Sequence, residues 1–195
     1  GIEYQVGEVV GEICAMTATE SASKPVVVAP SGIYHSGYVV ADIQSAVRHW
    51  VEQAGAGPFA LFDDFTFVNP VYRGKAGGPS VALAFAYSGD SCIELIQPKN
   101  SDPSIYSETS GALHHVGIGV PILNAAVASY EAAGVTCAFK AEFPFGGGCA
   151  YLDTVGTLGV FTELVEMGPI VEGMLEQMRI AHRNWNRRDY TFTLA

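Results

Sequence analysis

Residues 34–40 read YHSGYVV, and residues 114–120 read HHVGIGV. The two stretches align at an offset of 80 residues, which places His35 on His115 and Gly37 on Gly117. Each stretch is followed by apolar residues spaced as on one face of a helix. These are Ile43, Ala46, Val47 and Trp50 in the first case and Leu123, Ala126, Val127 and Tyr130 in the second. The chain therefore contains an internal repeat that begins with a strand and continues into a helix.

Three strand-like runs follow each predicted helix. In the first copy they cover 62–68, 81–87 and 92–97, and a Gly- and Pro-rich loop is expected at 69–80. In the second copy they lie near 136–139, 150–153 and 159–165. The closing strands read CIELI (92–96) and FTELV (161–165) at an offset of only 69 residues, so the first copy is eleven residues longer. The loop at 69–80 is long enough to contain most of these extra residues.

This pattern predicts an α+β fold with two tandem βαβββ modules, at residues 31–100 and 111–167. Residues 1–30 form an N-terminal extension, whose polar stretch 17–23 we expect to be loose. Residues 168–195 are expected to form a C-terminal helix, at 169–188, and a tail. The apolar stripe of that helix fits packing on its own domain and a dimer contact equally well, and a homodimer is our expectation.

Composition excludes several classes of partner. The chain has 10 basic and 20 acidic residues, a net charge of −10, which disfavours nucleic acid and anionic membranes. No apolar run reaches the roughly 18 residues of a membrane helix, and no secretion signal is evident. Four cysteines, Cys14, Cys92, Cys137 and Cys149, include no CxxC pair. We expect four reduced thiols in a cytoplasmic protein.

The repeat places one His near the start and one Glu near the end of each copy: His35, Glu94, His115 and Glu163. Each Glu lies among apolar residues of a strand, where a buried carboxylate needs a partner. A single His and Glu would be more simply explained as a satisfied core pair, but their recurrence favours one divalent cation, Zn, Mn, Co, Ni or Fe. His114 is expected to point to the opposite face of its strand and to be structural, with a smaller chance that it replaces His115 as ligand.

Strand alternation also predicts a substrate pocket beside this site. Residues two or four positions from a candidate ligand share its face, which gives Cys92, Ile96, Phe161 and Val39 as predicted substrate contacts, together with Val165, Gly37, Gly117 and Gly119. Because this face is mostly apolar, we expect an apolar or aromatic carbonyl compound as substrate. Few cations lie in the repeats, so a coenzyme A ester is less favoured.

These motifs resemble the vicinal oxygen chelate superfamily, which includes glyoxalase I, methylmalonyl-CoA epimerase, extradiol dioxygenases and bleomycin-resistance proteins. The resemblance covers about residues 33–167 and implies a cupped, incomplete β-barrel around a metal held by His35, Glu94, His115 and Glu163. Extradiol dioxygenases lack a ligand at the position that matches Glu94, so its presence favours the glyoxalase and epimerase branch.

The resemblance implies a metal-dependent isomerase, epimerase or lyase that moves a proton next to a carbonyl group. Glu94 or Glu163 would be the catalytic base, or a hydroxide on the metal would act instead. Two alternatives remain open at this point. One is an extradiol-type Fe(II) dioxygenase, and the other is a non-catalytic protein that binds a small molecule on the same fold.

Overall fold

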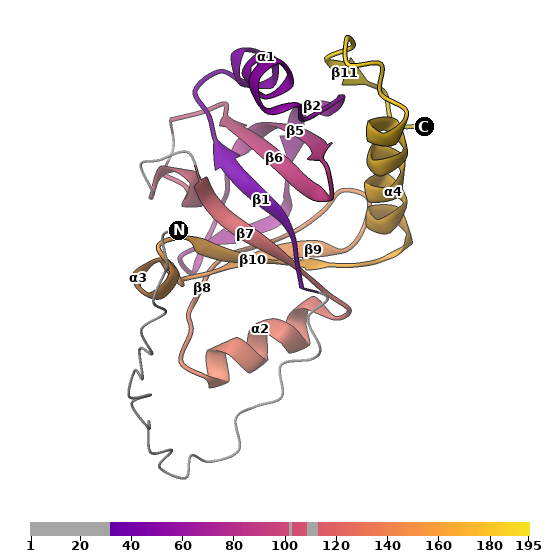
Figure 1. The fold of residues 1–195 in the computed structure, drawn as a ribbon. Coiled ribbons are helices and arrows are strands. Elements are labelled where there is room, and N and C mark those ends of the chain that lie inside the picture. Colours follow the sequence, from indigo (N-terminus) through magenta and orange to yellow (C-terminus); the bar gives the residue numbers. More distant parts are fainter. Residues whose placement is uncertain (1–31, 102, 109–112) are drawn as a thin grey trace, which may run out of the picture.

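The computed structural model describes residues 32–101, 103–108 and 113–195. The expected N-terminal extension and Cys14 lie outside these residues. The fold is α+β, as predicted: helices pack against a single curled, unclosed sheet (Figure 1). Within the described residues, no helix is both long and apolar enough to cross a membrane.

Each copy of the repeat forms a strand, a helix and further strands. The first copy comprises β1 (Ile33–Val39), α1 (Ile43–Ala54), β2 (Phe59–Thr66), β3 (Val68–Tyr72), β4 (Lys75–Ala76), β5 (Ser80–Ser88) and β6 (Ser91–Pro98). A short 3-10 helix, η1 (Ile105–Ser107), precedes the second copy. The second copy comprises β7 (Leu113–Val120), α2 (Leu123–Ala132), β8 (Cys137–Glu142), β9 (Gly148–Leu152), α3 (Val155–Leu158) and β10 (Phe161–Glu166).

The two copies join through their first strands. The strand order is β11-β2-β5-β6-β1-β7-β10-β9-β8-β3-β4, so β1 and β7 meet in the middle of the sheet. They pair antiparallel, whereas each pairs in parallel with the last strand of its own copy, β6 or β10. The equivalent strands of the repeat therefore form a seam, which crosses the centre of the molecule in Figure 1.

Alternation along the strands separates an outer layer from the inside of the cup. On β5, the small residues Ala82, Ala84 and Ala86 lie under α1 in one buried cluster. The larger Val81 and Leu83 belong to a second cluster on the inner side. Helix α1 begins at Asp42, whose side chain accepts a hydrogen bond from the Ser45 backbone N–H at 2.6 Å. Helix α2 covers β9 and β10 in the same way.

The expected loop at 69–80 is wrong, because part of it is a β-hairpin. Arg73 and Gly74 both adopt positive φ, 47° and 77°, which suits the tight turn between two paired strands. Val71 pairs with Ala76, and β3 also pairs with β8 of the second copy. The Gly and Pro content that indicated a loop therefore marks turns, and the extra residues of the first copy extend the sheet across to the second.

The C-terminal segment packs on the first copy. Helix α4 (Pro169–Arg183) ends before the predicted residue 188. In the turn that follows, the Asn186 side chain accepts hydrogen bonds from the backbone N–H groups of Arg188 and Asp189. Strand β11 (Thr191–Phe192) then pairs with β2. Met178 of α4 is buried in a cluster with residues of β2, β5 and β6. Of the two alternatives left open for this helix, packing on its own chain is observed, and the dimer contact stays untested.

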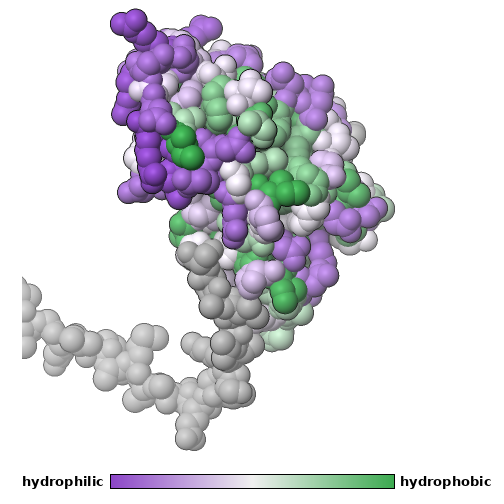
Figure 2. All heavy atoms as spheres, turned by 90° about the vertical axis from the view of Figure 1, so that its right-hand side faces the viewer, coloured by the Kyte–Doolittle hydropathy of each residue, from purple (hydrophilic) through white to green (hydrophobic). Residues whose placement is uncertain are grey.

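His182 fixes α4 to two loops of the first copy. Its Nδ1 donates to the Gly57 carbonyl oxygen at 2.6 Å, and its Nε2 accepts from the Gly89 backbone N–H at 3.2 Å. The α4 side of the molecule shows hydrophilic and apolar residues interspersed (Figure 2), and Ile170 and Ile180 are exposed there. The homodimer remains a prediction.

Candidate metal centre and its cavity

The strand register aligns each candidate ligand with a glycine of a neighbouring strand. Gly37 of β1 pairs with Glu94 of β6 on one side and with His115 of β7 on the other. Gly117 of β7 pairs with His35 of β1 and with Glu163 of β10. In each row the histidine and the glutamate therefore lie on either side of a glycine.

These two glycines leave the space that the imidazoles occupy. A Cβ atom added to Gly37 would lie 1.9 Å from Cε1 of His115, and one added to Gly117 would lie 1.9 Å from Cε1 of His35. Each imidazole thus lies across the neighbouring glycine of the other copy. The His-x-Gly motif of the sequence has a simple physical reason, since any larger residue in place of the glycine would displace the opposite histidine.

The four predicted ligands converge at one point. The Nε2 atoms of His35 and His115 are 2.8 Å apart. Oε2 of Glu94 lies 3.2 Å from His35 Nε2 and 2.9 Å from His115 Nε2. Oε2 of Glu163 lies 3.0 Å and 3.4 Å from the same two nitrogens. All four residues are at most 5% exposed, so the two carboxylates and two imidazoles form a buried cluster.

The carboxylates and imidazoles shift each other's pKa. Burial by itself lowers the pKa of His35, but Glu163 and Glu94 outweigh it and raise that pKa to about 9. The pKa of His115 is also raised, against burial, chiefly by Glu163. Burial alone would raise the pKa of both carboxyls, and the imidazoles hold them below their usual range. The cluster therefore keeps its carboxylates ionised and attracts positive charge.

A divalent cation fits this arrangement better than protons do. The two Nε2 atoms face each other, and a hydrogen bond between them uses only one proton. Glu94 Oε2 is buried and accepts no hydrogen bond from the described residues, although both nitrogens lie close to it. Bonds of about 2.1 Å in octahedral geometry separate neighbouring ligand atoms by about 3.0 Å, similar to the spacings here. Two nitrogens and two carboxylate oxygens suit Zn, Mn, Co, Ni or Fe.

Strand alternation predicted that His114 would point to the outer face, and this prediction is wrong. Gly37 pairs with His115 but Tyr38 pairs with Leu113, so His114 is the extra residue of a β-bulge. Its ring is fully buried, and its Nδ1 lies 3.1 Å from Nδ1 of His115. The cluster of potential ligands contains His115 and not His114, and the choice of His115 as metal ligand stays a prediction.

The hydrogen bonds of His114 assign the tautomer of His115. Nε2 of His114 lies 3.1 Å from the Ile105 carbonyl oxygen, which can only accept, so Nε2 carries the proton. Burial and the neighbouring His115 lower the pKa of His114 to about 4, which keeps the ring neutral at pH 7. Its Nδ1 then accepts from the Nδ1–H of His115, and the neutral His115 presents the lone pair of Nε2 to the cluster. His35 has no such partner, since its buried Nδ1 lacks a hydrogen bond within the described residues.

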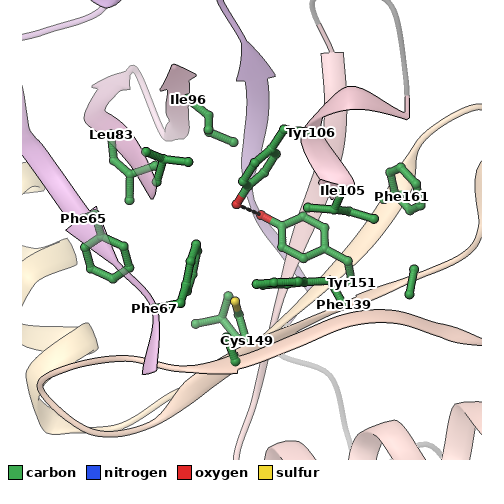
Figure 3. Close-up of a cluster of buried hydrophobic side chains, with 14 residues drawn as sticks. Phe65, Phe67, Leu83, Ile96, Ile105, Tyr106, Phe139, Cys149, Tyr151 and Phe161 are labelled. Carbon is green, nitrogen blue, oxygen red and sulfur yellow. Dashed lines mark hydrogen bonds between the residues drawn. The ribbon is translucent and has the colours of Figure 1, made fainter. Parts of the chain in front are cut away.

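A cavity of about 670 Å³, part of it open to solvent, adjoins this cluster. Three of the four candidate ligands line it, together with six phenylalanines and α4 residues such as Met174 and Leu175. Two tyrosines, Tyr106 of η1 and Tyr151 of β9, complete its polar surface. Figure 3 shows their hydroxyl groups pointing toward each other, beside the space bordered by Phe65, Phe67 and Leu83.

The predicted substrate contacts lie close to the cavity but do not line it; three of them are buried, and Val39 is partly buried. Ile96, Phe161 and Val39 pack within the inner aromatic cluster, and Cys92 lies in the cluster under α4. Their role as substrate contacts stays a prediction, while Val165 does line the cavity. Cys92, Cys137 and Cys149 are free thiols, in accord with the expectation of reduced cysteines.

Sequence patterns did not indicate the residues that dominate the cavity wall. Tyr106 lies between the two copies, in a segment without periodicity, and so carried no signal. The cavity face of α4, with Val171, Met174, Leu175 and Met178, was recognised only as an apolar stripe without an assigned partner.

Comparisons with known proteins agree with this fold. The family model described as the Glyoxalase/Bleomycin resistance protein/Dioxygenase superfamily matches residues 34–151. A solved hypothetical protein from Bacillus halodurans is 21% identical, with a TM-score of 0.52, and the match covers 70% of this chain and 94% of that one. A methylmalonyl-CoA epimerase from Mycobacterium tuberculosis is 18% identical, with a TM-score of 0.51 and coverage of 78% and 96%. No curated protein matches the chain. At these identities, the solved structures show a shared fold alone.

Proposed function

Because this chain belongs to the glyoxalase/bleomycin resistance protein/dioxygenase superfamily, we propose that it is a divalent-metal-dependent isomerase, epimerase or lyase. Its substrate is a small, mainly apolar compound with a carbonyl group, and the reaction moves a proton on the carbon next to that carbonyl. The observation that carries this proposal is the convergence of His35, Glu94, His115 and Glu163 at the edge of an apolar cavity.

The four candidate ligands and the phenylalanines of the cavity have different proposed roles. His35 and His115, with Glu94 and Glu163, would hold the cation, which when bound would supply positive charge next to the oxygen of the substrate carbonyl. Glu94 or Glu163 accepts that proton, because both carboxylates are ionised at neutral pH. The phenylalanines of the cavity exclude water from the reacting atoms.

Participation of Glu94 supports the isomerase reading over the dioxygenase. A dioxygenase of this fold needs two histidines and one glutamate, and here Glu94 approaches the same point as the other three side chains. A fourth ligand suits chemistry in which the metal keeps one oxidation state and a carboxylate exchanges a proton. The base is not assigned to one of the two glutamates, since the repeat places them equivalently.

Elemental analysis and metal titration test the proposal first. We expect about one Zn, Mn, Co, Ni or Fe ion per chain, and its loss in His115→Ala while the circular dichroism spectrum is retained. Failure to take up any of these cations would refute the proposed function and leave a protein that only binds small molecules. Iron dependence with consumption of oxygen would instead establish the dioxygenase.

Proton transfer is then measured by NMR in D₂O. The metal-loaded protein should catalyse deuterium exchange at the carbon next to the carbonyl of phenylacetone, and removal of the ion with EDTA should abolish it. Glu94→Gln and Glu163→Gln separate the two glutamates, because the variant without the base loses exchange even when metal is supplied in excess. Exchange at the wild-type rate in both variants would contradict a glutamate base.

A further inference from the structure

The cavity has a second polar point apart from the candidate metal ligands. The hydroxyl groups of Tyr106 and Tyr151 lie 3.2 Å apart, and the two residues are 4% and 1% exposed (Figure 3). Both line the cavity, whose remaining wall outside the metal cluster consists of Phe, Leu, Val and Met side chains. A ligand in this cavity therefore meets polar groups at two places only.

The tyrosine pair has a spare hydrogen-bond donor. Two phenols carry two protons, and the bond between them uses one. Within the described part of the chain, no acceptor is recorded for the other proton. A buried donor without a partner is unfavourable, so this proton is available to an oxygen atom of a ligand.

Packing holds both rings in place. The Tyr151 ring meets the His115 ring edge-on, with centroids 5.0 Å apart, and meets the Phe139 ring at 5.9 Å. The Tyr106 ring lies 5.2 Å from that of His114. A tyrosine hydroxyl keeps its proton at neutral pH and can therefore donate a hydrogen bond. The donor is thus fixed relative to the candidate metal ligands.

The charge of the cavity limits the rest of the ligand. Among the described residues that line the cavity there is no Lys or Arg, and the only charged groups among them are the clustered carboxylates and imidazole. Apart from the candidate metal centre, where the proposed function places the substrate carbonyl, phosphate or carboxylate groups would have no cationic partner in the cavity. Aromatic rings, in contrast, can pack edge-to-face against the phenylalanines, as Phe62 already does with Phe65 and with Phe85.

We propose that the cavity selects an uncharged aromatic carbonyl compound with a second oxygen atom, and that Tyr106 and Tyr151 determine this specificity by donating a hydrogen bond to that oxygen. The assignment of the carbonyl to the metal rests on the proposed function. The contact with the tyrosines does not, because it needs only the cavity.

Binding of acetophenone and its 3′- and 4′-hydroxy derivatives tests this proposal. The 2′ isomer is left out, because its hydroxyl could chelate the metal together with the carbonyl. In calorimetric or ligand-observed NMR titrations, we expect at least one hydroxylated isomer to bind about tenfold more tightly than acetophenone, as one good hydrogen bond allows. Propionyl-CoA should not compete. Absence of aromatic binding, or tighter binding of propionyl-CoA, would overturn the proposed ligand class.

Phenylalanine variants identify the donor. Tyr106→Phe and Tyr151→Phe should each keep part of the preference for the hydroxylated isomer, because the remaining phenol can donate to the ligand. The double variant should lose the preference and keep the affinity for acetophenone. Tyr190→Phe, which removes an exposed phenol bonded to Glu52, is the matched control. An unchanged preference in the double variant would overturn the assignment.

Metal content and the preference are measured on the same samples, with and without EDTA. If the wild-type protein takes up no metal but the preference depends on the tyrosines, the proposed function fails and this inference stands. If metal binds normally and the double variant retains the preference, this inference fails and the proposed function stands.

Discussion

Replacement of His114 by phenylalanine is the most informative single change at the candidate centre. Phenylalanine keeps a flat ring among the rings of Tyr106, Tyr151 and Phe161, which lie 5.1 to 5.6 Å from that of His114. It removes the acceptor for His115 Nδ1–H and the donor to the Ile105 carbonyl oxygen. The neutral His115 is then free to carry its proton on Nε2, where the cation would bind.

The magnitude follows from the two lost hydrogen bonds. Each lost hydrogen bond leaves a buried polar group without a partner, at a cost of about 1–3 kcal/mol, so the free energy of unfolding of the variant should be about 2–6 kcal/mol lower. For metal binding, loss of a partner that orients a histidine ligand typically weakens affinity about 10- to 100-fold. Both effects are large enough to measure. In a variant that stays folded, the loss of metal affinity does not follow from the loss of stability.

Competition with a chromophoric zinc chelator measures the affinity, and urea denaturation measures the stability. His49→Phe, at an exposed position of α1, is the matched control and should match the wild type in affinity. His114→Asn keeps an acceptor near His115 Nδ1 and should lose less affinity than His114→Phe. If His114→Phe folds and binds zinc as tightly as the wild type, the tautomer assignment is refuted.

Three further changes test other parts of the structure. Gly37→Ala places a Cβ atom 1.9 Å from His115 Cε1 and should weaken zinc binding at least about tenfold. The control Gly156→Ala, with no atom within 4 Å of the new Cβ, should bind zinc as the wild type does. Equal affinities of the two variants would contradict the role of Gly37 in leaving space for the imidazole of His115. His182→Ala removes two hydrogen bonds to the loops beneath α4 and should lower the free energy of unfolding by about 1–3 kcal/mol; an unchanged urea midpoint would contradict that role. Because the pKa of His35 is raised to about 9, this imidazole is protonated below that pH. Metal binding at pH 7.5 should therefore release about one proton per ion, and the affinity should increase as the pH rises toward 9. Calorimetry in two buffers of different ionisation enthalpy measures this release, and its absence would argue against His35 as a ligand.

The repeat made most of the architecture predictable. Matching His35 with His115 and Glu94 with Glu163 was enough to predict two βαβββ units and four candidate ligands. Periodicity also located α1, because its apolar stripe and its Asp42 cap are local properties of the sequence. The hairpin of β3 and β4 was missed, since Gly and Pro mark turns and loops alike and only the pairing with β8 distinguishes them.

The site depended on contacts that are not local. Strand alternation placed His114 on the outer face, but a bulge opposite Tyr38 turns it inward, and a bulge has no reliable signal in one sequence. Tyr106 reaches the cavity from the segment between the copies, and α4 covers the cavity from beyond both. Their positions follow from the way the sheet curls, which residue spacing does not encode.

The glycines of the seam make the two halves of the chain depend on each other. Gly37 gives space to a histidine of the second copy, and Gly117 gives space to a histidine of the first. A mutation at either glycine therefore displaces the histidine of the other copy. After a duplication, the two units cannot change independently at the histidines and glycines of this seam, and natural selection acts on both units together.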